Sequence, residues 1–101
     1  MIKRLLAMSA LALCAAPSMA ADDPLNKAGC MACHAKDKKL VGPAFKDIAA
    51  KYKGQDVVAK LSEKVRKGGA GVWGPIPMPP HNAEKISDAD LKAAVESILK
   101  S

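Results

Sequence analysis

Aromatic residues are scarce in this chain of 101 residues, which has one of each type: Phe45, Tyr52 and Trp73. A chain of this length forms a single domain and leaves no room for a large enzyme built around a substrate cleft. Small domains bury a low fraction of their surface and usually need additional support. With so few large side chains available, we expect something other than side chains to fill the core.

Acidic residues are absent from the first 20 positions, of which 15 are apolar. Two basic residues, Lys3 and Arg4, precede the apolar run Leu5–Ala16, and small residues follow it. This order is typical of a secretory signal peptide, and the run is too short for a membrane-spanning helix. We expect cleavage after Ala20, export to the periplasm, and a mature domain of residues 21–101 without a membrane anchor.

Cysteine becomes scarcer once that segment is removed, because Cys14 leaves with it and only Cys30 and Cys33 remain. A disulfide between these two would close too short a loop to hold a domain together. A lipid anchor on Cys14 is disfavoured because the bulky Leu13 precedes it. Two basic residues are also lost, so 14 basic against 10 acidic residues give the mature domain a net charge of +4.

Apolar residues recur at helical spacing in the mature domain, as in the second helix, where four of them share one face. An Asp-Pro pair and a capping-box-like Ser87 supply helix starts, and glycines supply ends. The pattern predicts an all-α fold with essentially no strand and four helices: Asp23 to about Cys33, about Phe45 to Tyr52, from after Asp56 to Gly68, and Ser87 through Ile98.

The segment Gly68–Pro80 has a different composition, with four glycines and five apolar residues interleaved with four prolines. Neither helix nor sheet suits it. Either it is a surface loop or its apolar residues, among them Trp73, Ile76 and Met78, pack over something. Because prolines stiffen a chain, we favour the second interpretation.

The pentapeptide Cys30-Met31-Ala32-Cys33-His34 has the C-x-x-C-H spacing by which c-type haem is attached. Two thiols one helical turn apart can form thioethers with the haem vinyl groups, and the following imidazole can bind the iron. A thioredoxin-like pair needs a βαβ context that is missing here. A zinc site would need His81 as a fourth ligand, with two ligands adjacent in the chain. A plain disulfide needs no histidine.

A second axial ligand would have to come from elsewhere in the chain: Met31, Met78 and His81 are the possibilities, and an open position is another. Met31 lies between the anchoring cysteines and cannot reach the opposite face of the ring. Met78 has prolines on both sides that would present its thioether at a fixed depth, although methionine is more often an ordinary core residue. These flanking prolines favour Met78 over His81 as the second axial ligand.

The motif Cys30–His34, the stretch Val41–Ala44 and the ten residues Gly71–Pro80 together resemble the small bacterial class I cytochromes c. The resemblance covers nearly the whole mature domain. It implies about four helices wrapped around one haem c, covalently attached through the two cysteines, with the first and last helices crossing.

The same resemblance implies roles for individual residues. His34 and Met78 would be the axial ligands of the iron, and the Pro43 carbonyl would accept a hydrogen bond from Nδ1 of His34. Trp73 would donate its indole N–H to a haem propionate, in addition to packing.

At two places the sequence does not determine how the family pattern applies. The family often has a basic residue facing the propionate, and either Lys64 or Arg66 could take that place. The last helix commonly carries an aromatic residue where this chain has Ser97, which leaves the packing of the terminal helices undecided.

An iron with two protein ligands has no position for a substrate, so we expect a one-electron carrier rather than an enzyme. Its partners would be larger redox proteins: a donor such as a cytochrome bc1-type complex, and an acceptor such as a terminal oxidase, nitrite reductase or peroxidase. We expect a monomer that does not bind nucleic acid, because basic and aromatic residues are not interleaved. The lysines are either solvated surface or a field that steers an acidic partner.

The exported protein should therefore begin at Ala21 and carry one covalent haem. Intact-mass measurement of periplasmic material should give the 81-residue chain plus one haem. A mass that lacks the haem, or that retains the first 20 residues, would contradict this prediction.

Overall fold

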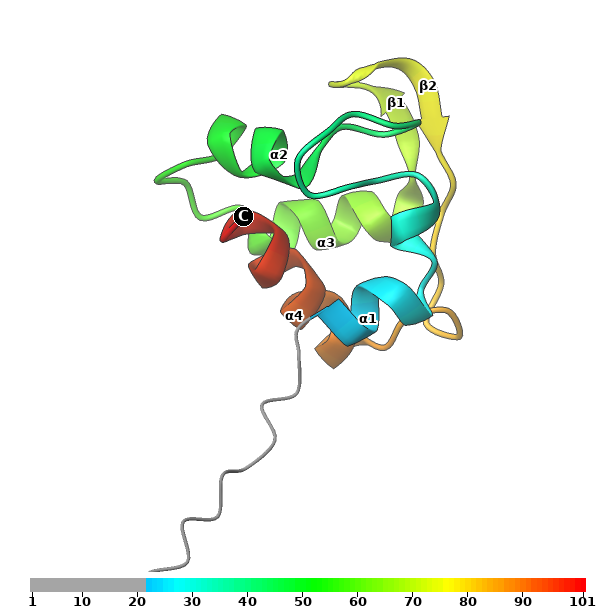
Figure 1. Ribbon diagram of the computed structural model, residues 1–101. Coiled ribbons are helices and arrows are strands. Elements are labelled where there is room, and N and C mark those ends of the chain that lie inside the picture. The colour runs from blue at the N-terminus through cyan, green and yellow to red at the C-terminus, as the bar shows by residue number, and fades with distance from the viewer. Residues whose placement is uncertain (1–21) are drawn as a thin grey trace, which may run out of the picture.

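The computed structural model describes residues 22–101, so the predicted signal peptide, its cleavage after Ala20 and Cys14 lie outside the described residues. Helices dominate this part of the chain, and a small hairpin interrupts them (Figure 1). The order is α1 (Asp22–Lys27), the 3₁₀ turn η1 (Cys30–Ala32), α2 (Phe45–Lys51), α3 (Val58–Lys67), β1 (Gly69–Gly71), β2 (Gly74–Met78) and α4 (Asp88–Leu99).

The four predicted helices are present, and the first is shorter than expected. It ends at Lys27, because Gly29 takes a left-handed conformation with φ of 76° and the chain restarts as η1. At the other end, Ser87 caps α4 as predicted: its Oγ accepts a hydrogen bond from the Asp90 amide at 3.2 Å.

The prediction that Gly68–Pro80 is neither helix nor strand is wrong, because β1 and β2 form an antiparallel hairpin. Gly69 pairs with Met78 and Gly71 with Gly74, with an irregularity between the two pairs. Both strands of a two-stranded sheet are edges, so prolines without an N–H can be accommodated in β2. The glycines at the turn supply the positive φ angles that it needs.

The hydrophobic core lies where α4 meets α1, α2 and α3. Its buried members come from all parts of the described chain: Leu25, Phe45, Ile86, Leu91, Ala94 and Val95. The first and last helices are in contact, as the resemblance implies. Ser97 is half-buried, and its neighbours Ile98 and Leu99 pack against the core instead of an aromatic residue.

Leu91, on α4, is 3% exposed within this core, whereas Leu40 on the loop before α2 is 43% exposed. Replacing Leu91 with alanine leaves a cavity and should lower the free energy of unfolding by about 2–5 kcal/mol. Leu40→Ala, which removes the same atoms from the surface, should change it by no more than about 0.5 kcal/mol. Denaturant titration followed by circular dichroism measures both; equal losses in the two variants would contradict this description of the core.

Candidate functional site

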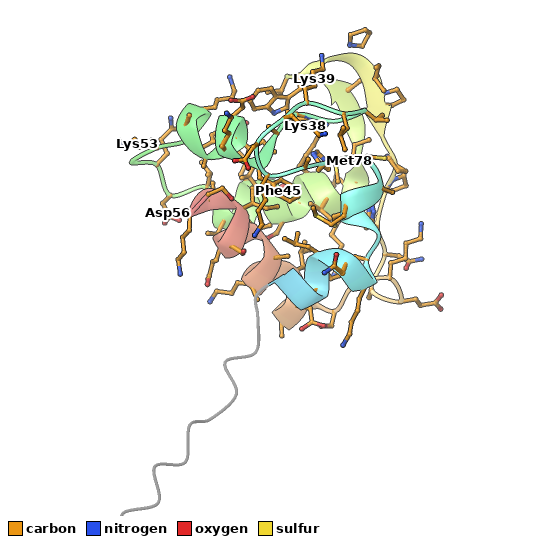
Figure 2. All side chains as sticks on the ribbon, in the orientation of Figure 1. Lys38, Lys39, Phe45, Lys53, Asp56 and Met78 are labelled. Carbon is orange, nitrogen blue, oxygen red and sulfur yellow. The ribbon has the colours of Figure 1, made fainter. Side chains whose placement is uncertain are left out.

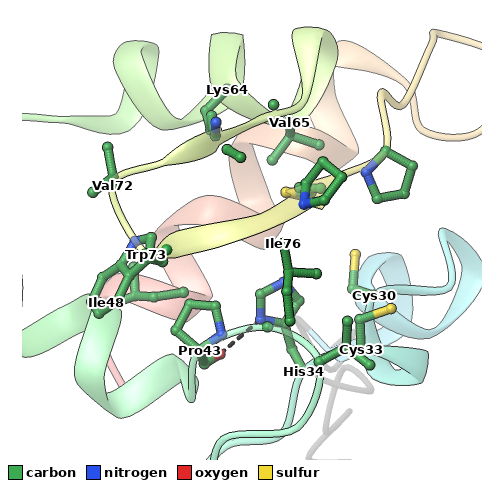
Figure 3. Close-up of a pocket in the computed structure, with 18 of the residues that line it drawn as sticks. Cys30, Cys33, His34, Pro43, Ile48, Lys64, Val65, Val72, Trp73 and Ile76 are labelled. Atoms are coloured by element: carbon green, nitrogen blue, oxygen red, sulfur yellow. Dashed lines mark hydrogen bonds between the residues drawn. The ribbon is translucent and has the colours of Figure 1, made fainter.

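A cavity of about 220 Å³ lies between the β1–β2 hairpin and the stretch from Cys30 to Phe45 (Figure 3). α3 and α4 also contribute to its wall, through Val65 and Val95 among others. Most of the lining side chains are apolar, and the hairpin supplies several of them, including Val72, Trp73 and Ile76. The apolar residues of Gly68–Pro80 therefore line this cavity, as the second interpretation of that segment expects, and Val72 and Ile76 also remain exposed.

The thiols of Cys30 and Cys33 lie next to each other at one end of the cavity (Figure 3). η1 places them there: the amides of Cys33 and His34 both donate to the Cys30 carbonyl, at 3.2 and 3.0 Å. Both cysteines are half-buried and not bonded to each other. Burial, with a further contribution from Cys33, raises the pKa of the Cys30 thiol.

The imidazole of His34 lines the same cavity and is held from several sides. Its Nδ1 donates a hydrogen bond to the Pro43 carbonyl at 2.7 Å, so Nε2 has the lone pair that can bind a metal. The Phe45 ring stacks on it, with centroids 5.2 Å apart and an interplanar angle of 22°. A Cβ on Gly42 would lie 2.5 Å from Cε1 of the imidazole, so only glycine fits there.

The loop between His34 and α2 brings these supports into position. The Gly42 amide donates to the Cys33 carbonyl at 2.7 Å, and the Phe45 amide donates to the Ala35 carbonyl at 2.9 Å. The loop therefore folds back on η1 and places Pro43 beside His34. The sequence predicts Phe45 only on a helix face and gives Gly42 no role of its own; the glycine immediately before Pro43 is the signal available for that role.

Met78 ends β2, is half-buried and lines the cavity together with Pro77 and Pro79. His81 is 8% exposed and, within the described chain, is not among the residues that line the cavity. Its Nδ1 is 2.9 Å from the Pro79 carbonyl, and its amide donates to the Val65 carbonyl at 2.9 Å. Of Met78 and His81, the two candidates for the second axial ligand, only Met78 is among the described residues that line the cavity.

The zinc alternative fails in the part of the chain that the structure describes, where no three His, Cys, Asp or Glu side chains converge on a possible metal position. His81 therefore does not join Cys30, Cys33 and His34. Two neighbouring thiols, one imidazole with a free Nε2 and one thioether, set around an apolar space, instead match the donor set of a covalently attached haem.

The two basic residues proposed to face the haem propionate, Lys64 and Arg66, differ in their surroundings. Lys64 lines it, whereas Arg66 bonds to Asp88 and to backbone carbonyls elsewhere. Trp73, at the hairpin turn, is 40% exposed and lines the cavity. The Lys51 Nζ lies 5.6 Å from the Trp73 ring centroid, a cation–π contact between α2 and the hairpin that the sequence did not suggest.

Comparison with known proteins agrees with this geometry. Residues 24–101 match the Cytochrome c family. The chain is 46% identical over 83 residues to cytochrome c-551 of Pseudomonas aeruginosa, covering 78% of this chain and 77% of that one. It is 50% identical over 94 residues to cytochrome c-552 of Nitrosomonas europaea, covering 92% and 88%.

The crystal structure of the wild-type Nitrosomonas europaea cytochrome c552 is similar to this fold, with a TM-score of 0.69 and 49% identity over 77% of this chain and 95% of that chain. The resemblance to small bacterial class I cytochromes c that the sequence predicts is confirmed, and cytochrome c-551 is among the relatives. Proteins of this kind carry electrons and are not enzymes. The chain therefore belongs to the cytochrome c family, among the small monohaem carriers that bind one haem c covalently through a cysteine pair.

Proposed function

We propose that this chain is a periplasmic carrier that passes single electrons between larger redox proteins, through an iron bound by His34 and Met78. The observation that supports this most directly is that Cys30, Cys33, His34 and Met78 all line one apolar cavity. When bound there, haem c supplies an iron that alternates between Fe(II) and Fe(III).

His34 would bind the iron through Nε2. The hydrogen bond from its Nδ1 to the Pro43 carbonyl fixes the tautomer and makes the imidazole a stronger donor. The Phe45 ring stacks on the imidazole, and the missing side chain of Gly42 leaves room for it. This preorganisation means that the ligand needs little rearrangement between oxidation states.

Met78 would bind from the other side, and a thioether ligand raises the reduction potential relative to a second histidine. The apolar lining keeps water away and also affects the potential. With both axial positions taken by side chains, no position remains for a substrate, which agrees with electron transfer alone.

Lys64 and Trp73 are the residues on this wall that could neutralise or hydrogen-bond the haem propionates. We favour Lys64 over Arg66 for the charge, because the Arg66 guanidinium is engaged by Asp88 and by the Ile86 carbonyl. Trp73 offers its indole N–H as a donor.

We further propose that residues 1–20 are a signal peptide cleaved after Ala20, so that residues 21–101 act as a monomer in the periplasm. The order of basic, apolar and small residues supports this. No helix among the described residues is long and apolar enough to cross a membrane. By the resemblance, the donor would be a bc1-type complex and the acceptor a terminal oxidase, nitrite reductase or peroxidase.

The docking face that we propose surrounds the cavity. Exposed apolar residues Val41, Val72 and Ile76 lie at its edge, and Lys39 lines the cavity with them. Figure 2 shows Lys38 and Lys39 on this side of the molecule. An apolar patch beside lysines suits brief encounters with a partner whose redox centre is ringed by acidic residues.

Replacing Met78 with alanine tests the second ligand. The weak absorption band of a thioether–iron bond, near the red end of the visible spectrum, should disappear. The reduction potential should fall by about 59 mV or more, which is a tenfold change in the one-electron equilibrium, and carbon monoxide should bind. His81→Ala should retain the band. If His81→Ala loses the band while Met78→Ala keeps it, the assignment of Met78 as the second ligand is wrong.

Charge reversal tests the docking face. Lys36 and Lys39 follow the Cys30–His34 motif closely in the sequence, and both side chains are exposed. Lys36→Glu with Lys39→Glu should slow electron exchange with an acidic redox protein at least tenfold at low salt. The difference from wild type should shrink at 0.15 M salt, where charges are screened beyond about 8 Å. Lys85→Glu with Lys100→Glu makes the same change in net charge away from the cavity and should have a small effect. Rates that do not depend on salt would show that the lysines only solvate the surface.

A further inference from the structure

The last turn of α3 holds the backbone around Met78. A Cβ on Gly68 would lie 2.3 Å from the Met78 carbonyl oxygen, so the two backbones approach as closely as only glycine allows. Three residues after Met78, the His81 amide donates to the Val65 carbonyl at 2.9 Å. The segment that positions the thioether is therefore docked on α3 from both ends.

The side chain of Arg66, on the same turn of α3, binds the segment that follows Met78. Its Nη1 donates to the His81 carbonyl at 3.3 Å and to the Ile86 carbonyl at 2.7 Å. Its Nη2 pairs with Asp88 at 2.5 Å. One guanidinium thus contacts the beginning of the connection between β2 and α4, its end, and the first turn of α4.

The connection itself has little regular structure to hold it. It runs over residues 79–87 without helix or strand. Its own side-chain hydrogen bonds are local, since Asn82 accepts from the amides of Glu84 and Lys85. A planar fork with several donors can bridge two carbonyls and a carboxylate at once, which a lysine ammonium does less well. The Arg66 side chain is 23% exposed and its bonds to the two carbonyls are partly shielded from water, whereas the Asp88 side chain is 97% exposed.

We propose that Arg66 is a positioning residue for Met78: by bracing the 79–87 connection against α3, it sets how often the thioether leaves the iron. This inference rests on the proposed function, in which Met78 is an axial ligand. Loosening the brace raises the population in which Met78 is displaced. An added ligand that competes for that position then binds more tightly in proportion to that population.

Imidazole binding to the oxidised, haem-loaded protein measures this population. We expect Arg66→Ala to bind imidazole at least tenfold more tightly than wild type, which is about 1.4 kcal/mol. It should also lose the thioether band at a lower denaturant concentration. Amide hydrogen exchange at His81 should be faster, because its bond to Val65 opens more often.

Three controls separate positioning from general destabilisation and from charge. Ser87→Ala removes the cap of α4 and lowers stability without touching the connection's contacts with α3. Lys67→Ala removes one positive charge from the neighbouring position. Asp88→Asn weakens the ion pair and keeps both carbonyl contacts. All three should bind imidazole within threefold of wild type. If Arg66→Ala fails to mature, Arg66→Met is used in its place, because methionine keeps the packing of the side-chain stem.

The outcomes distinguish this inference from the proposed function. If wild type has the thioether band and Arg66→Ala binds imidazole no more tightly than Ser87→Ala, the positioning role is overturned and the ligand assignment stands. The proposed bracing of residues 79–87 is also overturned if Asp88→Asn binds imidazole as tightly as Arg66→Ala, because the ion pair to α4, and not the two carbonyl contacts, would then account for the effect. If wild type lacks the band and binds imidazole as tightly as Met78→Ala, the ligand assignment itself is wrong.

Discussion

The helices of this domain pack against one another only around α4 and leave an apolar cavity beside that core. The rest of the structure depends on this constraint. Their buried core is confined to the region around α4, where a few residues such as Leu25, Phe45 and Leu91 meet. Beside it remains an apolar cavity of about 220 Å³. Haem c, which this family binds covalently, supplies the large flat apolar surface that the three aromatic side chains cannot. The cofactor is therefore part of the core as well as the redox centre.

Two segments without helical structure form opposite walls of the cavity, and each is stiffened in its own way. The loop before α2 is tied back to η1 by backbone hydrogen bonds, which bring Pro43 to His34. The hairpin relies on proline and on pairing between β1 and β2. Each wall therefore presents one of the two side chains that we propose as iron ligands, His34 and Met78, on a backbone with little freedom, and such rigidity would keep rearrangement between Fe(II) and Fe(III) small.

α3 contributes both to the cavity wall and to the contacts of the connection between β2 and α4. Lys64 lines the cavity, and two residues later Arg66 bonds to the connection that follows Met78. Residues two apart on a helix point in different directions, so one helix can contribute to the cavity wall and also contact the 79–87 connection. The sequence left Lys64 and Arg66 as equal possibilities, because spacing alone does not say which side of α3 meets the cavity.

Local chemistry made the motif, the four helices and the Ser87 cap predictable, since each depends on residues within about one turn of one another. The hairpin was not predictable, because its strands pair across glycines and prolines that locally disfavour a sheet. Nor were the contacts of His34 with Phe45 and Gly42, the approach of Lys51 to Trp73, or the three bonds of Arg66. These join residues separated along the chain, so only the tertiary packing of the loop, the hairpin and α3 decides them.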